Sequence, residues 1–430
     1  MDITLRAGSI IEGKLTAPPS KSDAHRALIC AALRGEGAQV SGLGDSIDVL
    51  TTIEALNAMG ATSEWNQDTL CYTGWADSQG EIRVNCRESG STLRFLLPVC
   101  GALGRTCTFA GEGRLPLRPV SVILDEMAEH GVSASCPQLP LELSGRLEPG
   151  KYTIPGNISS QFISGLLMAL PYAGGVSSIH IPGKLESAAY VDMTIDTLRH
   201  YGIHWDSHTT EAGTTYSMVP AESNAEPPRP YVVEGDWSGA AFLLASGALG
   251  GSVQVGGLDP ESRQGDKAIA HILEQMGAAV AWPQPRQVTV TAPDATTGAR
   301  ALVPADVDVS AVPDLFPVLA VLAAGAEGTS VFRNVARLRI KESDRVQTVC
   351  DMIEALGGSV RVEGDTVYVD GTGSLTGGVV DSCGDHRIAM SAAVASLICK
   401  DAVTILGAQC CAKSYPGFFE DFAKIGGNRV

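Results

Sequence analysis

Four short motifs in this sequence combine cations with carboxylates or hydroxyls at close spacing. Residues 339–345 place three cations around two carboxylates within seven positions, and further cations stand in residues 18–26, 384–387 and 411–414. The whole chain is acidic, with 48 Asp and Glu residues against 31 Lys and Arg residues and a formal net charge of -17. Cations concentrated in a few motifs of an acidic protein favour a pocket for a small, highly charged anion, whereas a nucleic-acid-binding protein carries a broad basic face.

Composition limits the class of protein further. The chain has 430 residues, of which 44% are hydrophobic and 18% charged, so we expect a folded protein large enough for two domains. The negative charge and the aromatic content of only 5% argue against nucleic acid and anionic membranes as partners. Residues 1–5 lack the basic start of a secretory signal, and apolar stretches such as 315–326 are too short to span a bilayer. The eleven cysteines contain no Cys-x-x-Cys pair and are expected to be reduced. We therefore predict a cytoplasmic protein.

A repeat in the glycines indicates how these motifs are positioned. Six times a helix-like apolar pattern ends in glycine and gives way to a short strand-like segment, with 69 to 80 residues between successive glycines. Glycine just past a helix adopts the left-handed conformation without a steric penalty. The six glycines are Gly60, Gly131, Gly202, Gly277, Gly357 and Gly426.

A second series of small-residue helices, rich in Ala and Leu, interleaves with the first. These helices finish near Gly37, Gly104, Gly175, Gly251, Gly328 and Asp401, and each is followed by β-prone residues. One unit therefore consists of a strand, a small buried helix, a strand, an amphipathic helix and a hairpin such as 359–362 with 366–369. Six such units suit two lobes of three, with residues 219–230 as part of the hinge between them. The alternative is that glycine punctuates any α/β protein at such intervals.

The polar motifs fall at the starts of the small-residue helices. Ser22 opens the first, Ser91 the second, Ser159 and Ser160 the third, Asp314 the fifth and Asp385 the sixth. A helix N-terminus presents unpaired N–H groups to an anion, so converging helix starts would bind phosphate without a metal or a Walker loop. The alternative for each is a plain helix cap. His200, His204 and His208 are not predicted to bind zinc, because Gly202 ends the helix between the first two.

Taken together, the motifs resemble those of the 5-enolpyruvylshikimate-3-phosphate synthase family, in the family's order along nearly the whole chain. They are residues 18–22 with Arg26, residues 90–94, Arg118 with Pro119, residues 159–161, residues 341–345, residues 385–387 and Lys413. The resemblance implies a two-lobed, inside-out α/β barrel with three βαβαββ repeats in each lobe. It places residues 20–228 in the N-terminal lobe and residues 1–19 with 229–430 in the C-terminal lobe, with hinge strands near 19–21 and 219–230.

The resemblance also implies an activity: transfer of the enolpyruvyl group from phosphoenolpyruvate to the 5-hydroxyl of shikimate-3-phosphate, with release of phosphate, in the shikimate pathway to chorismate and the aromatic amino acids. It implies a monomer whose partners are these two small molecules, with no cofactor and no metal. The residues expected to hold shikimate-3-phosphate are Lys21, Ser22, Arg26, Ser159, Ser160, Gln161, Ser187, Asp314, Arg337 and Lys341. Those expected around phosphoenolpyruvate are Lys21, Gly90, Arg118, Gln161, Arg345, Arg387 and Lys413.

Three residues are expected to carry the chemistry. Glu342 is assigned to proton transfer at the methylene carbon, Asp314 to the attacking 5-hydroxyl, and Lys21 to cationic assistance. Asp314 has the alternative role of orienting the substrate hydroxyls. Two departures from the family pattern leave roles open: Glu88 stands where the family often has an amide, and Arg337 where some members have asparagine.

Two other functions remain as alternatives. One is the related enolpyruvyl transferase that acts on UDP-N-acetylglucosamine, which carries a reactive cysteine in the loop before its Arg-Pro pair. The matching residues 111–119 contain no cysteine. The other is a non-catalytic anion-binding repeat protein, which would leave Glu342 and Asp314 without a role.

Overall fold

The computed structural model describes residues 1–76, 81–220, 229–293 and 302–430, and these divide into two compact units. Unit 1 comprises Met1–Ser20 and Glu234–Val430, and unit 2 comprises Lys21–Val233. The lobes predicted from the sequence divided after residues 19 and 228. Of the predicted hinge at 219–230, residues 221–228 lie outside the described part of the chain. Each unit has its own hydrophobic core.

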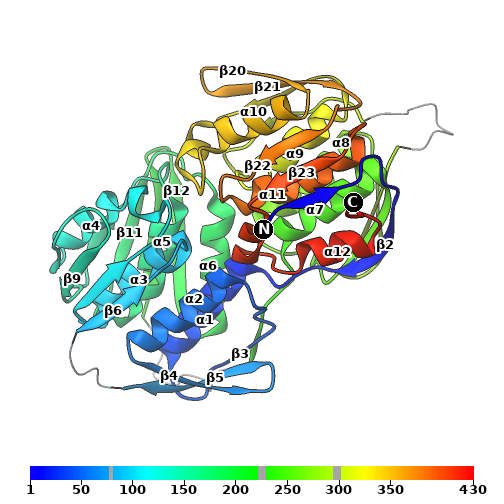
Figure 1. Ribbon diagram of the computed structural model, residues 1–430. Helices are drawn as coiled ribbons and strands as arrows, with labels where there is room; N and C mark the ends of the chain where they lie inside the picture. Colours follow the sequence, from blue (N-terminus) through cyan, green and yellow to red (C-terminus); the bar gives the residue numbers. More distant parts are fainter. Residues whose placement is uncertain (77–80, 221–228, 294–301) are drawn as a thin grey trace. The chain divides into compact units, whose positions relative to one another are not determined.

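Unit 2 contains three four-stranded sheets (Figure 1). Their strands, in spatial order, are β14 (Tyr231–Val232), β3 (Gln39–Ser41), β5 (Thr69–Trp75) and β4 (Ala61–Asn66); then β6 (Ile82–Asn85), β7 (Cys107–Ala110), β9 (Leu141–Gly145) and β8 (Val132–Ala134); then β10 (Lys151–Thr153), β11 (Ser178–Pro182), β13 (Gly213–Val219) and β12 (His204–Thr210). The helices are α1 (Lys21–Arg34), α2 (Ile47–Ala58), α3 (Gly90–Ala102), α4 (Ser121–Ala128), α5 (Ser160–Ala169) and α6 (Ala188–His200), with the 3₁₀ turns η1 (Leu115–Leu117) and η2 (Leu170–Tyr172).

Unit 1 contains two four-stranded sheets and one three-stranded sheet. In spatial order the strands are β16 (Ala279–Gln284), β17 (Gln287–Thr291), β15 (Gly251–Gly256) and β2 (Ile11–Thr16); then β18 (Asp306–Asp308), β19 (Glu327–Arg333), β21 (Thr366–Thr372) and β20 (Ser359–Glu363); then β1 (Ile3–Leu5), β23 (Val403–Leu406) and β22 (Gly378–Asp381). The helices are α7 (Trp237–Gly250), α8 (Ala268–Gln275), α9 (Phe316–Ala324), α10 (Arg345–Ala355), α11 (His386–Ala395) and α12 (Phe418–Lys424), with the 3₁₀ turns η3 (Gly265–Lys267), η5 (Ala336–Ile340), η6 (Ser396–Ile398) and η7 (Ala408–Lys413).

The predicted strand–helix–strand–helix–hairpin repeat is confirmed. In the repeats built on β6, β10 and β18, the first two strands are parallel and the hairpin returns antiparallel to the second strand. The predicted hairpin pairs Val360 with Val369 and Val362 with Val367. All six punctuating glycines have a φ between +80° and +114°, which is the left-handed conformation that glycine tolerates best.

Three repeats borrow a strand from elsewhere in the chain. β14 is the first strand of the first repeat and lies parallel to β3. β2 is the first strand of the fourth repeat and lies parallel to β15. In the sixth repeat β1 pairs antiparallel with β23, in the place that a hairpin strand takes elsewhere, and Arg429 bridges to Leu5 beside it. The sixth repeat therefore departs from a complete βαβαββ unit, because the residues after α12 supply a single bridge and β1 supplies the strand.

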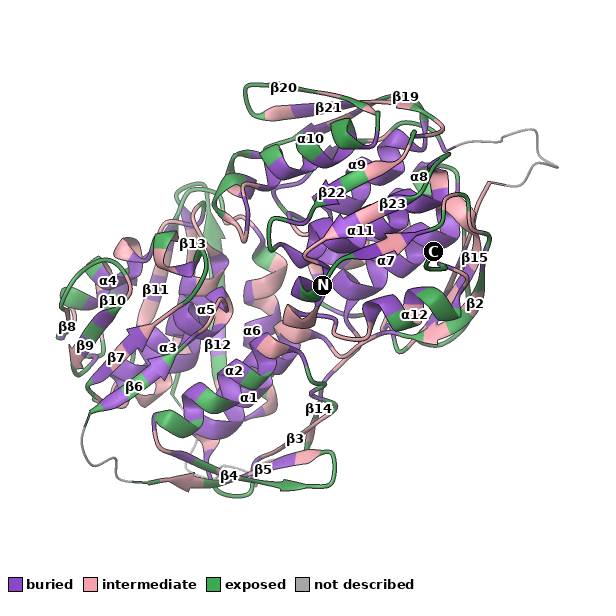
Figure 2. Cartoon of the chain, viewed as in Figure 1, coloured by how far each residue is buried: buried purple, intermediate pink, exposed green. Residues whose placement is uncertain are grey.

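The small-residue helices form the centre of each unit, as predicted. In α9 every residue is buried, and in α7 all residues from Trp237 to Ala248 are buried (Figure 2). The amphipathic helices bury one face only; α8, for example, buries Ile269, Ile272 and Leu273. A helix that is apolar on all sides is stable only inside a hydrophobic core. A polar ligand can therefore reach such a helix at its N-terminus but not along its sides.

Candidate active site

A buried arginine organises the carboxylates of unit 1. Arg345 is the first residue of α10, and its side chain is 1% exposed. Its Nη1 donates to Asp314 Oδ1 over 2.6 Å, its Nη2 to Glu342 Oε2 over 2.8 Å, and its Nε to Asp385 Oδ2 over 2.8 Å. One guanidinium thus joins carboxylates from three separate segments of the chain. We call Arg345 with Asp314, Glu342, Asp385, Lys341 and Arg387 the Arg345 cluster.

Asp314 is the carboxylate that the cations of the cluster share. Arg387 Nη2 donates to Asp314 Oδ2 over 2.8 Å, and Lys341 Nζ lies 3.7 Å from Asp314 Oδ1. Burial favours the neutral acid, but Arg387, Lys341 and Arg345 together outweigh it and hold the pKa of Asp314 well below its ordinary value. Asp314 is therefore an anion at neutral pH, suited to accept a hydrogen bond from a hydroxyl.

Asp385 serves both as a helix cap and as an ion-pair partner. Its side chain accepts a hydrogen bond from the backbone N–H of Arg387, which makes it the N-cap of α11, as predicted. Asp314 was also predicted to open its helix, and this was wrong. The N-cap of α9 is Leu315, and the carboxylate of Asp314 is instead directed to Arg345 and Arg387.

Burial lowers the pKa of Lys341 to about 8; Asp314 opposes this shift, and the nearby cation Arg345 adds to it. Lys341 should therefore carry a positive charge below about pH 8 and lose it above. We expect the affinity for shikimate-3-phosphate, which this lysine is proposed to contact, to fall as the pH rises through 8. Titration calorimetry from pH 6.5 to 9.5 measures this. Lys341→Arg keeps its charge over that range, so a fall of equal size in that variant would contradict the assignment.

Asp266 is a buried acid that the sequence analysis missed. It lies in η3, is fully buried, and its carboxylate bonds to the Ser238 hydroxyl in the first turn of α7. Burial raises its pKa to about 6, with a further contribution from the charge of Asp314. No pattern in the sequence distinguishes Asp266 from the exposed acidic residues near it. It is identified only by its buried position in the fold.

The other two predicted residues of unit 1 lie on short 3₁₀ turns. Lys413 is the last residue of η7, and its Nζ donates to the Gly384 carbonyl over 2.8 Å, next to the start of α11. Arg337 is a half-buried residue of η5, the turn that leads to Lys341.

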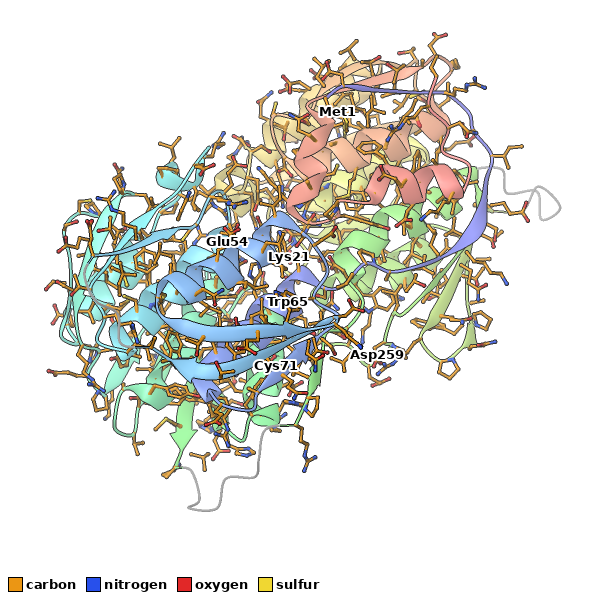
Figure 3. The ribbon with its side chains drawn as sticks, turned by 60° about the horizontal axis from the view of Figure 1, so that its bottom comes forward. Met1, Lys21, Glu54, Trp65, Cys71 and Asp259 are labelled. Atoms are coloured by element: carbon orange, nitrogen blue, oxygen red, sulfur yellow. The ribbon has the colours of Figure 1, made fainter. Side chains whose placement is uncertain are left out.

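In unit 2 the predicted residues gather at the starts of the central helices. Lys21 is the first residue of α1 (labelled in Figure 3), and its Nζ donates to Asp48 Oδ2 over 3.0 Å. Arg26 follows one turn later and is 2% exposed. Its guanidinium donates to Thr194 Oγ1 over 2.7 Å and to the Ser22 carbonyl over 2.7 Å, which fixes its orientation.

Gln161 connects the start of α5 to the start of α3. Its Nε2 donates to Ser91 Oγ over 2.8 Å, and its Oε1 accepts from Arg94 Nη1 over 2.8 Å. Ser159 caps α5 as predicted, by accepting from the backbone N–H of Gln161. Ser160 follows it and is buried. Ser91 was predicted to open α3, but the N-cap is Ser89, since its side chain accepts from the backbone N–H of Thr92.

The remaining predicted residues of unit 2 have close neighbours. A Cβ added at Gly90 would lie 2.6 Å from Arg118 Nη1, so any larger residue would have to displace the end of this arginine from the start of α3. Ser187, the N-cap of α6, is buried and has a left-handed φ of 55°. Glu88, whose role the sequence left open, packs against Gly113 in the loop before Arg118, where a Cβ would overlap its carboxylate.

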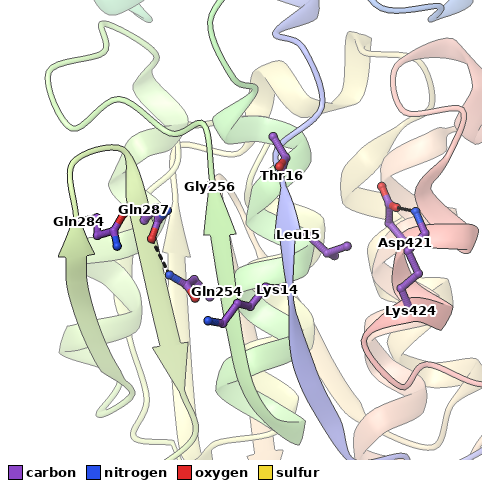
Figure 4. A pocket seen from close by; sticks show the side chains of 9 residues that line it. All are labelled: Lys14, Leu15, Thr16, Gln254, Gly256, Gln284, Gln287, Asp421 and Lys424. Carbon is purple, nitrogen blue, oxygen red and sulfur yellow. Dashed lines mark hydrogen bonds and ion pairs between the residues drawn. The ribbon is translucent and has the colours of Figure 1, made fainter.

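Two further features of the structure bear on ligand binding. Among the described residues there is no group of three or more His, Cys, Asp or Glu side chains arranged to hold a metal ion. A polar groove of about 660 Å³ lies on unit 1 and contains none of the predicted site residues. In it Gln254 bonds to Gln287 and Lys424 pairs with Asp421 (Figure 4). The groove is lined by Lys14, Leu15, Thr16, Gln254, Gly256, Gln284, Gln287, Asp421 and Lys424.

Comparison with known proteins decides the family. The model of the family described as EPSP synthase (3-phosphoshikimate 1-carboxyvinyltransferase) matches residues 5–422. The chain belongs to the EPSP synthase family. The fold class predicted from the sequence, an α/β protein of two units with three repeats each, is that of the family.

Curated relatives and solved structures agree with this assignment. A 3-phosphoshikimate 1-carboxyvinyltransferase of Clostridium kluyveri is 40% identical over 425 residues, covering 97% of this chain and 96% of the relative. A protein of the same name from Methanocorpusculum labreanum is 37% identical over 428 residues, covering 97% of each chain. The EPSP synthase structure from Acinetobacter baumannii superimposes with a TM-score of 0.79 at 25% identity, covering 100% of this chain and 99% of that one. Each of these three matches covers at least 97% of this chain.

Within the described ranges, the helices are all too short or too polar to cross a bilayer.

Proposed function

We propose that this chain transfers the enolpyruvyl group of phosphoenolpyruvate to the 5-hydroxyl of shikimate-3-phosphate and releases phosphate. Membership of the EPSP synthase family supports the reaction. The single observation that carries the mechanism is the Arg345 cluster, in which two acids, Asp314 and Glu342, share one buried cation. A non-catalytic anion-binding protein has no need for these acids, because they would repel its ligand.

Proton transfer defines the roles of the two acids. In the addition step a proton joins the methylene carbon of phosphoenolpyruvate, the 5-hydroxyl oxygen attacks the neighbouring carbon, and the hydroxyl loses its proton. In the elimination step a proton leaves the new methyl group and phosphate departs. We assign the carbon proton to Glu342 and the hydroxyl proton to Asp314, with Lys21 providing positive charge for the phosphate.

The contacts of Arg345 suggest how Glu342 becomes available. In this structure the Arg345 guanidinium donates hydrogen bonds to three protein carboxylates. The carboxylate of phosphoenolpyruvate is a bidentate match for arginine, so on binding it would replace one of the protein carboxylates at Arg345. Replacement of Glu342 at Arg345 would free that carboxylate from its ion pair and leave it available for proton transfer.

The remaining substrate contacts are proposed as follows. The residues assigned to shikimate-3-phosphate are Lys21, Ser22, Arg26, Ser159, Ser160, Gln161, Ser187, Asp314, Arg337 and Lys341. Those assigned to phosphoenolpyruvate are Lys21, Gly90, Arg118, Gln161, Arg345, Arg387 and Lys413. Buried arginines beside helix N-termini are suited to both, since phosphate and carboxylate accept two parallel N–H bonds.

A phosphate-release assay tests the proposed reaction. The purified protein should release phosphate only when phosphoenolpyruvate and shikimate-3-phosphate are both present. Release with UDP-N-acetylglucosamine in place of shikimate-3-phosphate would assign the chain to the related transferase. Binding of both substrates without phosphate release would identify a non-catalytic protein.

A further inference from the structure

A buried chain of side-chain hydrogen bonds links three helices of unit 2. His25 Nδ1 of α1 lies 2.7 Å from Thr52 Oγ1 of α2. Thr52 Oγ1 lies 2.7 Å from Thr92 Oγ1 of α3, and the Thr92 hydroxyl donates to Ser89 Oγ over 2.7 Å. All four side chains are fully buried. We call these four residues the His25 chain; none of them was predicted as a site residue from the sequence.

The hydrogen-bond directions fix where the imidazole proton lies. Thr92 has one hydroxyl proton, which it donates to Ser89, so the contact between Thr52 and Thr92 uses the proton of Thr52. A second acceptor for Thr52, the Asp48 carbonyl, lies further away at 3.4 Å. The Thr52 oxygen must then accept from His25, which places the proton of the neutral imidazole on Nδ1. Burial and the neighbouring cations Lys21 and Arg26 lower the pKa of His25 well below 6.5, so the ring is neutral at pH 7.

The two ends of the chain lie beside the proposed substrate contacts. His25 stands one turn into α1, the helix that begins with Lys21. Ser89 is the N-cap of α3, and Gly90 and Ser91 follow it. Gln161 in turn bonds Ser91, so side-chain hydrogen bonds join the start of α3 both to α1, through α2, and to the start of α5.

The His25 chain is also suited to its position beside Lys21 and Arg26, where the protein is proposed to bind anions. A charged residue linking these helices would add its own field to that of Lys21 and Arg26, whereas hydroxyls and a neutral imidazole fix geometry without changing the net charge. Buried polar groups of this kind specify one arrangement of the helices, since any shift leaves a buried donor unpaired.

We propose that His25, Thr52 and Thr92 are positioning residues that hold the start of α3 against α1, so that Ser89 and Gly90 are correctly placed for phosphoenolpyruvate. This proposal rests on the function proposed above. The residues act through the backbone and cap of α3 and do not touch substrate. A displacement of about 1 Å in a positioned group costs as much as a hundredfold in rate.

The wild-type protein provides the first test. With the histidines labelled with ¹⁵N and the His25 signals assigned by comparison with His25→Gln, long-range ¹H–¹⁵N correlation at pH 7 should show neutral His25 with its proton on Nδ1. A proton on Nε2, or a charged ring at this pH, would overturn the inferred direction of the chain. This measurement is independent of activity.

Kinetics of three variants provide the second test. Thr52→Val removes the hydroxyl at nearly constant shape and should lower kcat/KM for phosphoenolpyruvate roughly 10- to 100-fold. Thr52→Ser restores the hydroxyl and should recover most of the activity. The control is Thr51→Val. Thr51 is equally buried on the same helix, but within the described part of the chain its hydroxyl bonds only the Ile47 carbonyl of α2, so kcat/KM should stay near wild type.

The kinetics distinguish a positioning role of the His25 chain from a general packing role. Equal losses in Thr52→Val and Thr51→Val would reduce the chain to a general packing role and overturn the proposal, as would wild-type kinetics in Thr52→Val. If Thr52→Val does not fold, the proposal is still tested by the kinetics of Thr52→Ser and by the His25 tautomer in the wild-type protein. If the wild-type protein shows no phosphate release, the proposed function fails, while the tautomer measurement still reports on the His25 chain itself.

Discussion

Glu342→Gln is expected to lower the turnover number by roughly a hundredfold or more, because it removes the group assigned to proton transfer at the methylene carbon. Glutamine has nearly the same shape and can still accept a hydrogen bond from Arg345 Nη2, which is 2.8 Å from the Glu342 carboxylate. The affinity for shikimate-3-phosphate should therefore change little. The measurement is kcat at saturating concentrations of both substrates, together with the dissociation constant of shikimate-3-phosphate.

Isotope exchange makes this prediction specific for the carbon proton. In D₂O, with shikimate-3-phosphate present, reversible protonation should place deuterium on the methylene carbon of recovered phosphoenolpyruvate, and Glu342→Gln should lose this exchange. The control is Glu354→Gln, the same change at an exposed position of α10. Unchanged turnover in Glu342→Gln would move the role of proton donor to another residue.

Arg345→Met is expected to abolish activity and to reduce the free energy of unfolding by about 3–5 kcal/mol, the usual cost of leaving buried charges without their partner. Asp385 is 0% exposed and has Arg345 as its ion-pair partner at 2.8 Å, so the variant leaves that carboxylate in the core. The matched control is Arg339→Met. Arg339 pairs with Asp344 at 3.1 Å, but both side chains are more than one third exposed, and loss of such a pair costs about 0–1 kcal/mol.

Urea unfolding of both variants measures the difference, and its pH dependence gives a second check. The pKa of Asp385 is lowered because Arg345 outweighs the effect of burial, so this pair stabilises the folded state above the ordinary carboxyl pKa of about 4 and loses its effect as the pH falls below it. Adding Asp385→Asn to Arg345→Met should recover part of the loss. Similar stability of Arg345→Met and Arg339→Met would show that the Arg345 cluster does not hold unit 1 together.

Local features of the fold could be predicted from the sequence, because each depends on a few neighbouring residues. The six left-handed glycines, such as Gly60 and Gly357, end helices for a steric reason that acts within one turn. The burial of α9 follows from its having no polar face. The N-caps Ser159 and Asp385 were correct because the capping side chain and the N–H that it bonds lie two residues apart.

The chemistry of the Arg345 cluster was predicted only in part. The sequence brought Lys341, Glu342 and Arg345 together because they lie in one motif. It did not indicate that Asp314 and Asp385, which lie 31 and 40 residues from Arg345, would share its guanidinium. Nor did it indicate the buried acid Asp266.

What the sequence alone determined is therefore the repeat, the central helices and the motifs at their starts, since these follow from spacing and local sterics. The tertiary structure decided which repeats borrow β1, β2 and β14. It also decided which carboxylates Arg345 binds, and that His25, Thr52 and Thr92 meet between three helices. The physical reason is the same in each case: these contacts join segments far apart in the chain, and their partners are selected by how the helices and sheets pack rather than by any pattern within one segment.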